Sequence, residues 1–219
     1  MGTNVRQNIV TNGLVMYLDA GSRQSYPGSG ATWRDLSGNG YNGTLNNSPT
    51  FNTDNGGSIA LNGTNQWISF GSVINTNSAF TLEFWALSSV DGNPTLFSGT
   101  TANGYLQIRM WTAYVSLVNS FIAELGSFGP TSGTPLNTIS QIVITKTGTS
   151  CVCYTNGSQK GTLTVTPTFT TTNTTIGVNS GNSEFFTGRI YKFLYYNRVL
   201  SAQEIAQNYN ATKTRFGLT

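Results

Sequence analysis

The sequence predicts an all-β fold in which two antiparallel sheets pack as a sandwich, with one short helix near the C-terminus. Charged residues make up 9% of the 219 residues, whereas about 25% is typical of soluble proteins. This composition excludes coiled coils and long amphipathic helices. Gly, Asn, Ser and Thr together supply nearly half of the chain, as expected for many short turns. The hydrophobic share of 37% and the aromatic share of 12% are enough for a core, which excludes a disordered chain.

Apolar and β-branched residues recur between turn residues at the spacing expected of a sandwich. Leu14–Ala20 is the first predicted strand and ends at Gly21, before a long loop rich in Gly, Ser and Asn over residues 22–47. In Phe80–Leu87 apolar and polar residues alternate, which predicts a strand with one buried face. Asn156-Gly157 predicts a tight hairpin turn, because both residues tolerate positive φ. The other strands are predicted at Ser58–Leu61, Gln66–Phe70, Thr95–Ser98, Tyr105–Met110, Tyr114–Val118, Ile139–Lys146, Cys151–Thr155, Gly161–Thr166, Thr174–Val178 and Arg189–Tyr196.

One short helix is predicted near the C-terminus. Ser201 and Glu204 have the spacing of a capping box, in which each side chain bonds a backbone amide at the start of the helix. Leu200 and Ile205 occupy the positions of a hydrophobic staple around this start. The helix is therefore expected from about Ala202 to Asn210, where it would cover one end of the sandwich.

The chain is expected to form a single domain over residues 13–219, preceded by an N-terminal arm at residues 1–12. No internal repeat and no linker composition divides it. The first residues lack the apolar segment of a secretory signal. No stretch of about 18 apolar residues occurs, so no membrane-spanning helix is expected. The basic residues are scattered from Arg6 to Arg215, which argues against nucleic acid as a partner.

Cysteine and histidine usage limits the chemistry of the chain. Its two cysteines, Cys151 and Cys153, are separated by one residue, so on a strand they lie on the same face. We interpret them as small buried thiols without a disulfide, as expected in a reducing compartment. The chain contains no histidine. This excludes nucleophiles that need a Ser-His or Cys-His pair, and it excludes a zinc site, since two sulfurs alone do not hold the metal.

Five segments of the sequence carry a resemblance to a known fold. They are GLVMYLDAG at 13–21, SYPGSG at 25–30, WRDLSGNGYNGTL at 33–45, GSIALNGTNQWI at 57–68 and GRIYKFLYYNRVLSAQEI at 188–205. The chain thereby resembles concanavalin A-like, laminin G-like jelly-roll domains, especially those of bacteriophage structural proteins. The resemblance implies a jelly-roll sandwich of two antiparallel sheets. It implies much less about function, because this fold serves lectins, glycosidases, adhesion modules and virion proteins alike.

Glucanases are among the proteins with this sandwich, but the acidic residues do not have a glycosidase's spacing. Glycoside hydrolysis needs two carboxylates about 5–9 Å apart across the sugar. On one strand this means two acids within four residues of each other on the same face. No two acids of the chain are that close in sequence, so we expect a protein that is not an enzyme. The acids are Asp19, Asp35, Asp54, Glu83, Asp91, Glu124, Glu184 and Glu204.

Binding of a sugar requires an exposed aromatic ring for its apolar face, with amide and hydroxyl groups beside the ring. Trp111 and Tyr114, at the turn after one of the predicted strands, are the candidate rings. Asn103, Asn119 and Asn179 are the candidate polar contacts. The alternative is that Trp111 only covers the rim of a sheet. The aromatic residues expected in the core are Trp33, Trp67, Trp85 and Tyr191.

Asp19 and Asp35 flank the Gly-rich loop and are candidate ligands for calcium, which prefers hard oxygen ligands. Carbonyl groups of the loop would complete such a site. The alternative is that each carboxylate accepts hydrogen bonds from backbone amides of the loop, as Asp does in turns. No other cofactor is expected.

The sequence therefore leads to the hypothesis of a non-enzymatic bacteriophage virion protein, a capsid decoration or a tail or fibre component. Its lectin-like jelly roll would stabilise the particle, contact host-surface glycans, or both. The expected partners are other virion proteins, further copies of the chain in a homo-oligomer, and a cell-surface glycan. The expected location is the virion, after assembly in the host cytoplasm, with an extracellular location as the alternative. The alternative functions are a stand-alone carbohydrate-binding lectin module and, after it, a glycoside hydrolase.

Overall fold

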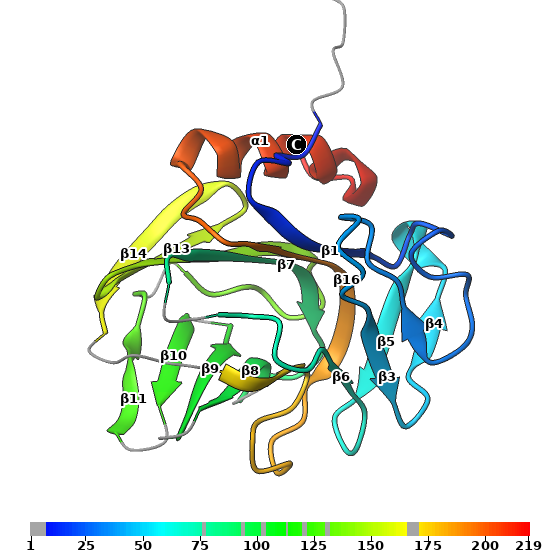
Figure 1. The fold of residues 1–219 in the computed structure, drawn as a ribbon, viewed down its shortest axis with the longest axis horizontal. Coiled ribbons are helices and arrows are strands. Elements are labelled where there is room, and N and C mark those ends of the chain that lie inside the picture. Colours follow the sequence, from blue (N-terminus) through cyan, green and yellow to red (C-terminus); the bar gives the residue numbers. More distant parts are fainter. Residues whose placement is uncertain are drawn as a thin grey trace, which may run out of the picture.

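Two antiparallel sheets lie face to face in the structure, and the helix α1 (Ala202–Thr212) lies across the outer side of one of them (Figure 1). The predicted all-β sandwich with one short C-terminal helix is thereby confirmed. This computed structural model describes residues 8–75, 78–92, 95–101, 104–112, 114–119, 122–129, 132–165 and 171–219.

The first sheet, sheet A, has the strand order β14-β13-β12-β7-β16-β5-β4, and β1 pairs with β16. Its strands are β1 (Leu14–Asp19), β4 (Thr50–Asn52), β5 (Ser58–Asn62), β7 (Phe80–Ser88), β12 (Ser140–Thr147), β13 (Ser150–Thr155), β14 (Ser158–Thr164) and β16 (Thr187–Tyr196). The second sheet, sheet B, has the order β11-β10-β9-β8-β15-β6-β3-β2. Its strands are β2 (Thr32–Trp33), β3 (Gly43–Asn46), β6 (Trp67–Ser69), β8 (Thr95–Thr101), β9 (Gly104–Met110), β10 (Val115–Asn119), β11 (Ile122–Ser127) and β15 (Thr171–Ile176). Two short 3-10 helices are η1 (Asp54–Gly56) and η2 (Lys213–Phe216).

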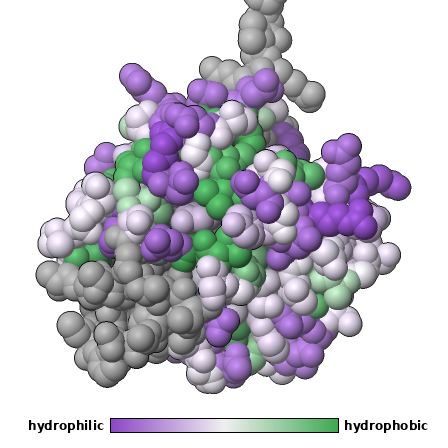
Figure 2. Space-filling model, in the orientation of Figure 1, coloured by the Kyte–Doolittle hydropathy of each residue, from purple (hydrophilic) through white to green (hydrophobic). Residues whose placement is uncertain are grey.

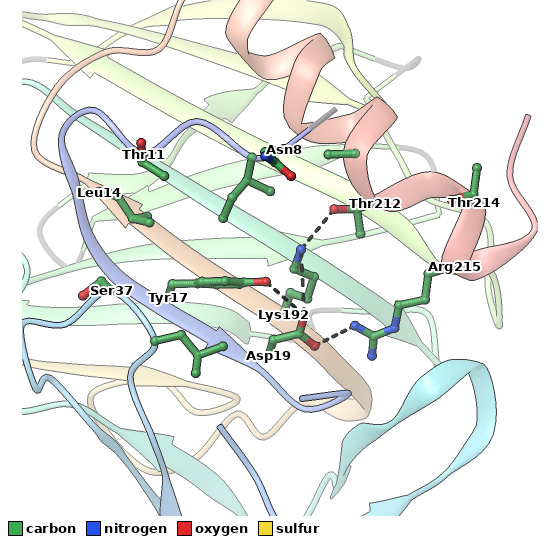
Figure 3. A pocket seen from close by; sticks show the side chains of 13 residues that line it. Asn8, Thr11, Leu14, Tyr17, Asp19, Ser37, Lys192, Thr212, Thr214 and Arg215 are labelled. Carbon is green, nitrogen blue, oxygen red and sulfur yellow. Dashed lines mark hydrogen bonds and ion pairs between the residues drawn. The ribbon is translucent and has the colours of Figure 1, made fainter. Parts of the chain in front are cut away.

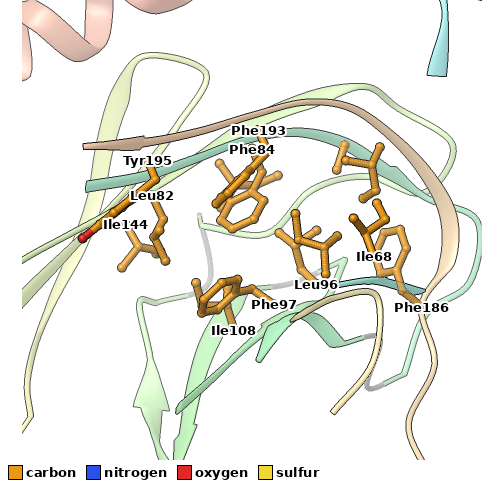
Figure 4. Close-up of a cluster of buried hydrophobic side chains, with 14 of the residues drawn as sticks. Ile68, Leu82, Phe84, Leu96, Phe97, Ile108, Ile144, Phe186, Phe193 and Tyr195 are labelled. Atoms are coloured by element: carbon orange, nitrogen blue, oxygen red, sulfur yellow. The ribbon is translucent and has the colours of Figure 1, made fainter. Parts of the chain in front are cut away.

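The main core fills the space between the two sheets (Figure 4). The ring of Phe84 on β7 lies 5.0 Å from that of Phe193 on β16 and 6.0 Å from that of Phe97 on β8. None of these three side chains is exposed to solvent. The contacts follow from the alternation that predicted the strand Phe80–Leu87, because every second residue of a strand points to the same side.

The opposite side of β7 is buried as well, although the sequence predicted only one buried face. Glu83 and Trp85 point away from the main core, yet neither is more than 1% exposed. The ring of Tyr209 on α1 stacks on that of Trp85, with centroids 5.8 Å apart and planes at 4°. The helix therefore covers the outer face of sheet A and does not close an end of the sandwich, as Figure 1 shows.

The predicted capping box is present at the start of α1. The amide of Glu204 donates to Ser201 Oγ at 3.2 Å, and the amide of Ser201 donates to Glu204 Oε2 at 2.8 Å. Arg198 pairs with the same carboxylate at 2.6 Å. Leu200 and Ile205, the predicted staple, are both buried beneath the helix. The helix ends two residues later than predicted.

Four strands of the described part of the chain were not predicted. The strands β2 and β3 lie inside the expected Gly-rich loop, β4 follows it, and β11 lies between two predicted strands. The strands β2, β3 and β4 are short and consist mainly of Gly, Thr and Asn, so pairing with a neighbouring strand is what makes them β structure. The predicted hairpin turn is confirmed, with φ of 50° at Asn156 and 75° at Gly157.

The buried residues largely agree with the prediction. Trp33, Trp85 and Tyr191 are fully buried, whereas Trp67 is only half-buried on β6. The two cysteines, Cys151 and Cys153, are buried and free, and burial raises the pKa of each to about 12.

Hydrophilic residues cover most of the surface visible in Figure 2, and hydrophobic residues gather there mainly beneath α1. None of the helices in the described ranges combines the length and the apolar character needed to cross a bilayer.

Candidate functional site

The outer face of sheet B carries mainly hydroxyl and amide side chains. One row of paired residues crosses five strands through Thr44, Ser69, Thr175, Ser98 and Gln107. The neighbouring positions of the same strands point inward and carry the apolar core residues. This face therefore differs from the outer face of sheet A, where apolar residues pack beneath α1.

Trp111 and Tyr114 lie together at the turn between β9 and β10, as the sequence predicted for a pair of candidate rings. Their centroids are 5.3 Å apart, the planes are tilted by 31°, and both residues are half-buried. The Trp111 amide donates to the Tyr114 carbonyl at 2.9 Å, which continues the strand pairing into the turn. Thr112, at the tip, donates from its amide and its hydroxyl to Asp91 at 3.1 and 2.8 Å. These bonds fix the turn and hold the pKa of Asp91 below its usual value.

A single carboxylate, that of Glu184, is bound by side chains from β8 and β9. Arg109 Nη2 donates to both carboxylate oxygens at 2.8 and 2.9 Å. Gln107 Nε2 donates to Oε2 at 2.7 Å and Thr95 Oγ1 donates to it at 3.3 Å. Gln107 also donates to Thr95. Burial acts to raise the pKa of Glu184, but the hydrogen bonds from Gln107 and Arg109 outweigh it and lower the pKa.

Arg109 belongs to the ion pair and is close to the aromatic pair in the sequence. It lies two residues before Trp111, and the alternation of a strand places both on the outer side of sheet B. Its partner across the strand pair is Ser116 of β10. We call this region the β8–β10 face, defined by Thr95, Ser98, Gln107, Arg109, Trp111, Tyr114, Ser116 and Glu184.

The β8–β10 face contains a concentration of buried polar atoms without a protein partner. Among the described residues nine buried side-chain atoms lack a hydrogen bond, and five of them belong to this face. Buried polar atoms of this kind are rare in native proteins, so each needs an explanation. The five are Ser98 Oγ, Gln107 Oε1, Arg109 Nε, Trp111 Nε1 and Ser116 Oγ.

The three asparagines predicted to contact a ligand lie in different surroundings. Asn179 is 8% exposed, and its Oδ1 accepts from the amides of Ser183 and Glu184 at 2.9 and 3.3 Å. It shapes the loop that carries Glu184. Asn119 is paired with Leu106 in the strand register, and its side chain is outside the described part. Asn103 lies outside the described residues.

Sequence reasoning missed the polar half of the β8–β10 face. Arg109 and Glu184 are separated by 75 residues, and no local pattern relates them. The only sequence signal is that Glu184 is a lone acid in a segment of Gly, Asn and Ser. Such a residue has no local partner, so it is a candidate for a distant contact.

A pocket of about 930 Å³ lies beside α1 on the outer side of sheet A, away from the β8–β10 face (Figure 3). Its charged side chains are Asp19, Lys192 and Arg215. Arg215 donates to Asp19 at 2.6 Å, and Lys192 donates to Thr212 at 3.0 Å and lies 4.0 Å from Asp19. Burial lowers the pKa of Lys192. These groups bind one another and thereby attach the C-terminal segment to β1 and β16.

The carboxylates of Asp19 and Asp35, the predicted calcium ligands, both accept hydrogen bonds from the protein. Asp35 accepts from the amides of Tyr17, Ser37 and Tyr41 at 2.9, 2.9 and 3.1 Å. Asp19 accepts from the Gly21 amide at 2.9 Å, besides Arg215. Within the described ranges no three His, Cys, Asp or Glu residues cluster as metal ligands. The observed bonds are those of the alternative expectation, and calcium binding by these residues stays a prediction.

The sequence of this chain matches one known family. The family model described as the concanavalin A-like lectin/glucanases superfamily matches residues 62–206, about two thirds of the chain. No curated protein matches the sequence.

Several solved structures share the fold at low sequence identity. Domain 4 of a GH43 extracellular arabinanase from Geobacillus stearothermophilus, solved with arabinotriose, is 18% identical, with a TM-score of 0.72 over 89% of this chain and 97% of that one. Trypanosoma rangeli sialidase is 16% identical, with a TM-score of 0.69 over 93% of this chain and 33% of the sialidase. The binding domain of botulinum neurotoxin DC, solved in complex with SialylT, is 14% identical, with a TM-score of 0.68 over 92% of this chain and 52% of that one. This chain thus spans about a third to a half of the two larger proteins.

Proposed function

This chain belongs to the concanavalin A-like lectin/glucanases superfamily, and from that premise we propose that it is a non-catalytic glycan-binding domain. The β8–β10 face is the proposed site. The proposal rests on two observed pairs, Trp111–Tyr114 and Arg109–Glu184, which the alternation of β9 puts on the same outer face of sheet B.

The chemistry of this face matches that of a sugar. A pyranose or furanose ring offers an apolar side, which packs on an aromatic ring, and hydroxyl groups that both donate and accept hydrogen bonds. Trp111 and Tyr114 supply the aromatic surface, and the Arg109–Glu184 pair supplies a donor and an acceptor next to it. The side chains of Arg109 and Glu184 are 14% and 29% exposed, so part of the pair is open to solvent.

Two of the similar structures support a carbohydrate ligand. The arabinanase domain was solved with arabinotriose, and the neurotoxin binding domain was solved with SialylT. The identities of 18% and 14% make these a likeness of fold alone. They support the class of ligand and leave the glycan itself open.

The carboxylates support a binding role without catalysis. A glycosidase needs one acid whose pKa is raised, and hydrogen bonds lower the pKa values of Glu184, Asp91 and Glu204, so these three acids are unsuited to that role. Each of the seven acids with a described side chain is bound to protein donors. The principal partners are Arg215 for Asp19, Tyr17 for Asp35, Arg189 for Asp54, Gln141 for Glu83, Thr112 for Asp91, Arg109 for Glu184 and Arg198 for Glu204.

The test is a glycan array probed with the wild type and with Trp111→Ala. We expect the wild type to bind a subset of glycans and Trp111→Ala to lose at least tenfold in affinity, which corresponds to about 1.4 kcal/mol. Tyr41→Ala is the matched control, because it removes an aromatic side chain that is 41% exposed and lies in the loop before β3. Its affinity should be unchanged. A broad array without any bound glycan, or equal binding by Trp111→Ala, would refute the proposal.

The bacteriophage particle remains the proposed context of this domain. It is supported by the resemblance of segments such as residues 33–45 and 188–205 to phage structural proteins. In that context the domain acts as a capsid decoration or a tail component, and the β8–β10 face contacts glycans on the host surface. A stand-alone lectin would use the same face without a particle.

A further inference from the structure

We infer that Glu184 sets the charge selectivity of the β8–β10 face, so that the wild-type protein binds neutral glycans and rejects glycans that place a carboxylate there. The inference rests on the proposed glycan-binding function. It names the class of ligand and the residue that selects it.

The first step is the arrangement of the donors. Thr95, Gln107 and Arg109 lie on adjacent strands of sheet B, and their side chains converge on one carboxylate. Thr95 and Gln107 are completely buried, so the strands hold these donors in place. A cluster of this kind complements a carboxylate in charge and in hydrogen bonding.

The second step is the origin of the carboxylate. Glu184 belongs to the loop between β15 and β16, and the side chain of Asn179 fixes this loop through the Ser183 and Glu184 amides. The chain therefore places its own anion on the donors. A carboxylate of a ligand would have to displace an intramolecular one, whose effective concentration is on the order of millimolar or more. It would also meet the negative charge of Glu184 at close range.

The third step concerns the hydrogen-bonding capacity that the Glu184 carboxylate still offers to a neutral sugar. Among the described residues only Arg109 donates to Glu184 Oε1, so this oxygen has acceptor capacity left for a hydroxyl group. The side chain of Glu184 is 29% exposed, so a ligand can approach it from solvent. A neutral sugar donates a hydroxyl group to this carboxylate and leaves the ion pair with Arg109 intact. The site is therefore selective for neutral glycans.

The experiment compares oligosaccharides in pairs. Each neutral oligosaccharide on an array stands beside its uronic-acid counterpart, and the array is probed with wild type, Glu184→Gln, Glu184→Asp and Asp54→Asn. We expect the wild type to prefer the neutral member at least tenfold. Glu184→Gln should gain at least tenfold in affinity for uronic-acid glycans, because Arg109 then lacks an anion. Glu184→Asp keeps the charge and should still reject them.

Asp54→Asn is the matched control. Asp54 is 64% exposed, is paired with Arg189 and lies away from the β8–β10 face, so its substitution changes the net charge by the same amount as Glu184→Gln. Its selectivity should equal that of the wild type. Thermal unfolding of each variant checks that it is folded, and Glu184→Asp provides a second reading should Glu184→Gln fail to fold.

The outcomes separate the two proposals. A wild type that binds uronic-acid glycans as tightly as neutral ones overturns the charge selectivity and leaves glycan binding established. Charge selectivity by Glu184 is also overturned when Glu184→Gln binds neutral glycans but still rejects the uronic-acid glycans. A wild type that binds no member of any pair refutes the proposed function, and the inference fails with it.

Discussion

Asn208 is a single residue on which four segments of the chain converge. It lies on α1 with no exposed surface, accepts from the Val10 amide at 2.8 Å and donates to Glu83 Oε2 at 2.7 Å. It also donates to the hydroxyl of Tyr196, at 3.0 Å, and that hydroxyl donates to the Val10 carbonyl. One amide side chain thus joins residues 8–12, β7, β16 and α1. The predicted boundary between an N-terminal arm at residues 1–12 and a domain from residue 13 stays a prediction.

Replacing this residue tests how much the junction contributes. Asn208→Ala removes the hydrogen-bond partner of the buried Val10 amide and of one oxygen of the buried Glu83 carboxylate. We therefore expect the free energy of unfolding to fall by about 2–3 kcal/mol. Urea denaturation measures it. Asn210→Ala, the control two residues further on the same helix, is exposed and should change stability by less than about 0.5 kcal/mol. Equal effects of both substitutions would show that the network does not hold the helix.

The candidate site shows how far residue-level prediction extends. Trp111 and Tyr114 could be proposed from the sequence because a turn brings near neighbours together, and their role in binding stays a prediction. Arg109 and Glu184 were missed because only the pairing of β9 with β8 and the path of the β15–β16 loop bring them together. The side chain of Asn179, a predicted ligand contact, bonds its own loop, and its contact with a ligand stays a prediction.

Elements whose signal lies within a few residues were predicted from the sequence, whereas strands that form only by pairing with a distant strand were not. The capping box of α1 depends on residues three apart, so the sequence contains all of it. The strands β3 and β4 depend on β6 and β5 for their hydrogen bonds, and their own residues resemble a loop. The second buried face of β7 depends on α1, which lies more than a hundred residues away in the sequence.

The start of α1 makes stability depend on pH. The hydrogen bond from Arg198, with further bonds from Ser201, lowers the pKa of Glu204 from 4.5 to about 2 in the folded protein. Because the folded-state pKa is the lower one, the contribution to stability is complete above about pH 4.5 and is lost as the pH falls toward 2. Glu204→Gln should therefore lose less stability than the wild type over this window. Unfolding free energies measured from pH 5 to pH 2 give the comparison, and parallel curves would contradict the assignment.

For the whole molecule, the two outer faces of the sandwich have different roles. The outer face of sheet A is covered by α1 and residues 8–12, which pack apolar side chains and satisfy the buried Glu83. The outer face of sheet B carries the polar β8–β10 face. Composition and strand spacing predicted the sandwich, since they describe both sheets at once. They did not predict which sheet the helix covers, because both sheets offer alternating strands.

The separation of the two faces gives a prediction for the particle context. A domain that binds host glycans through the β8–β10 face has to attach to its particle through another surface. Tagged wild-type protein should then co-sediment with phage particles in a density gradient, and Trp111→Ala should co-sediment equally while it loses glycan binding. A protein that remains monomeric in analytical ultracentrifugation and never accompanies particles would contradict the virion role. Loss of both properties in Trp111→Ala would instead identify the β8–β10 face as the assembly contact.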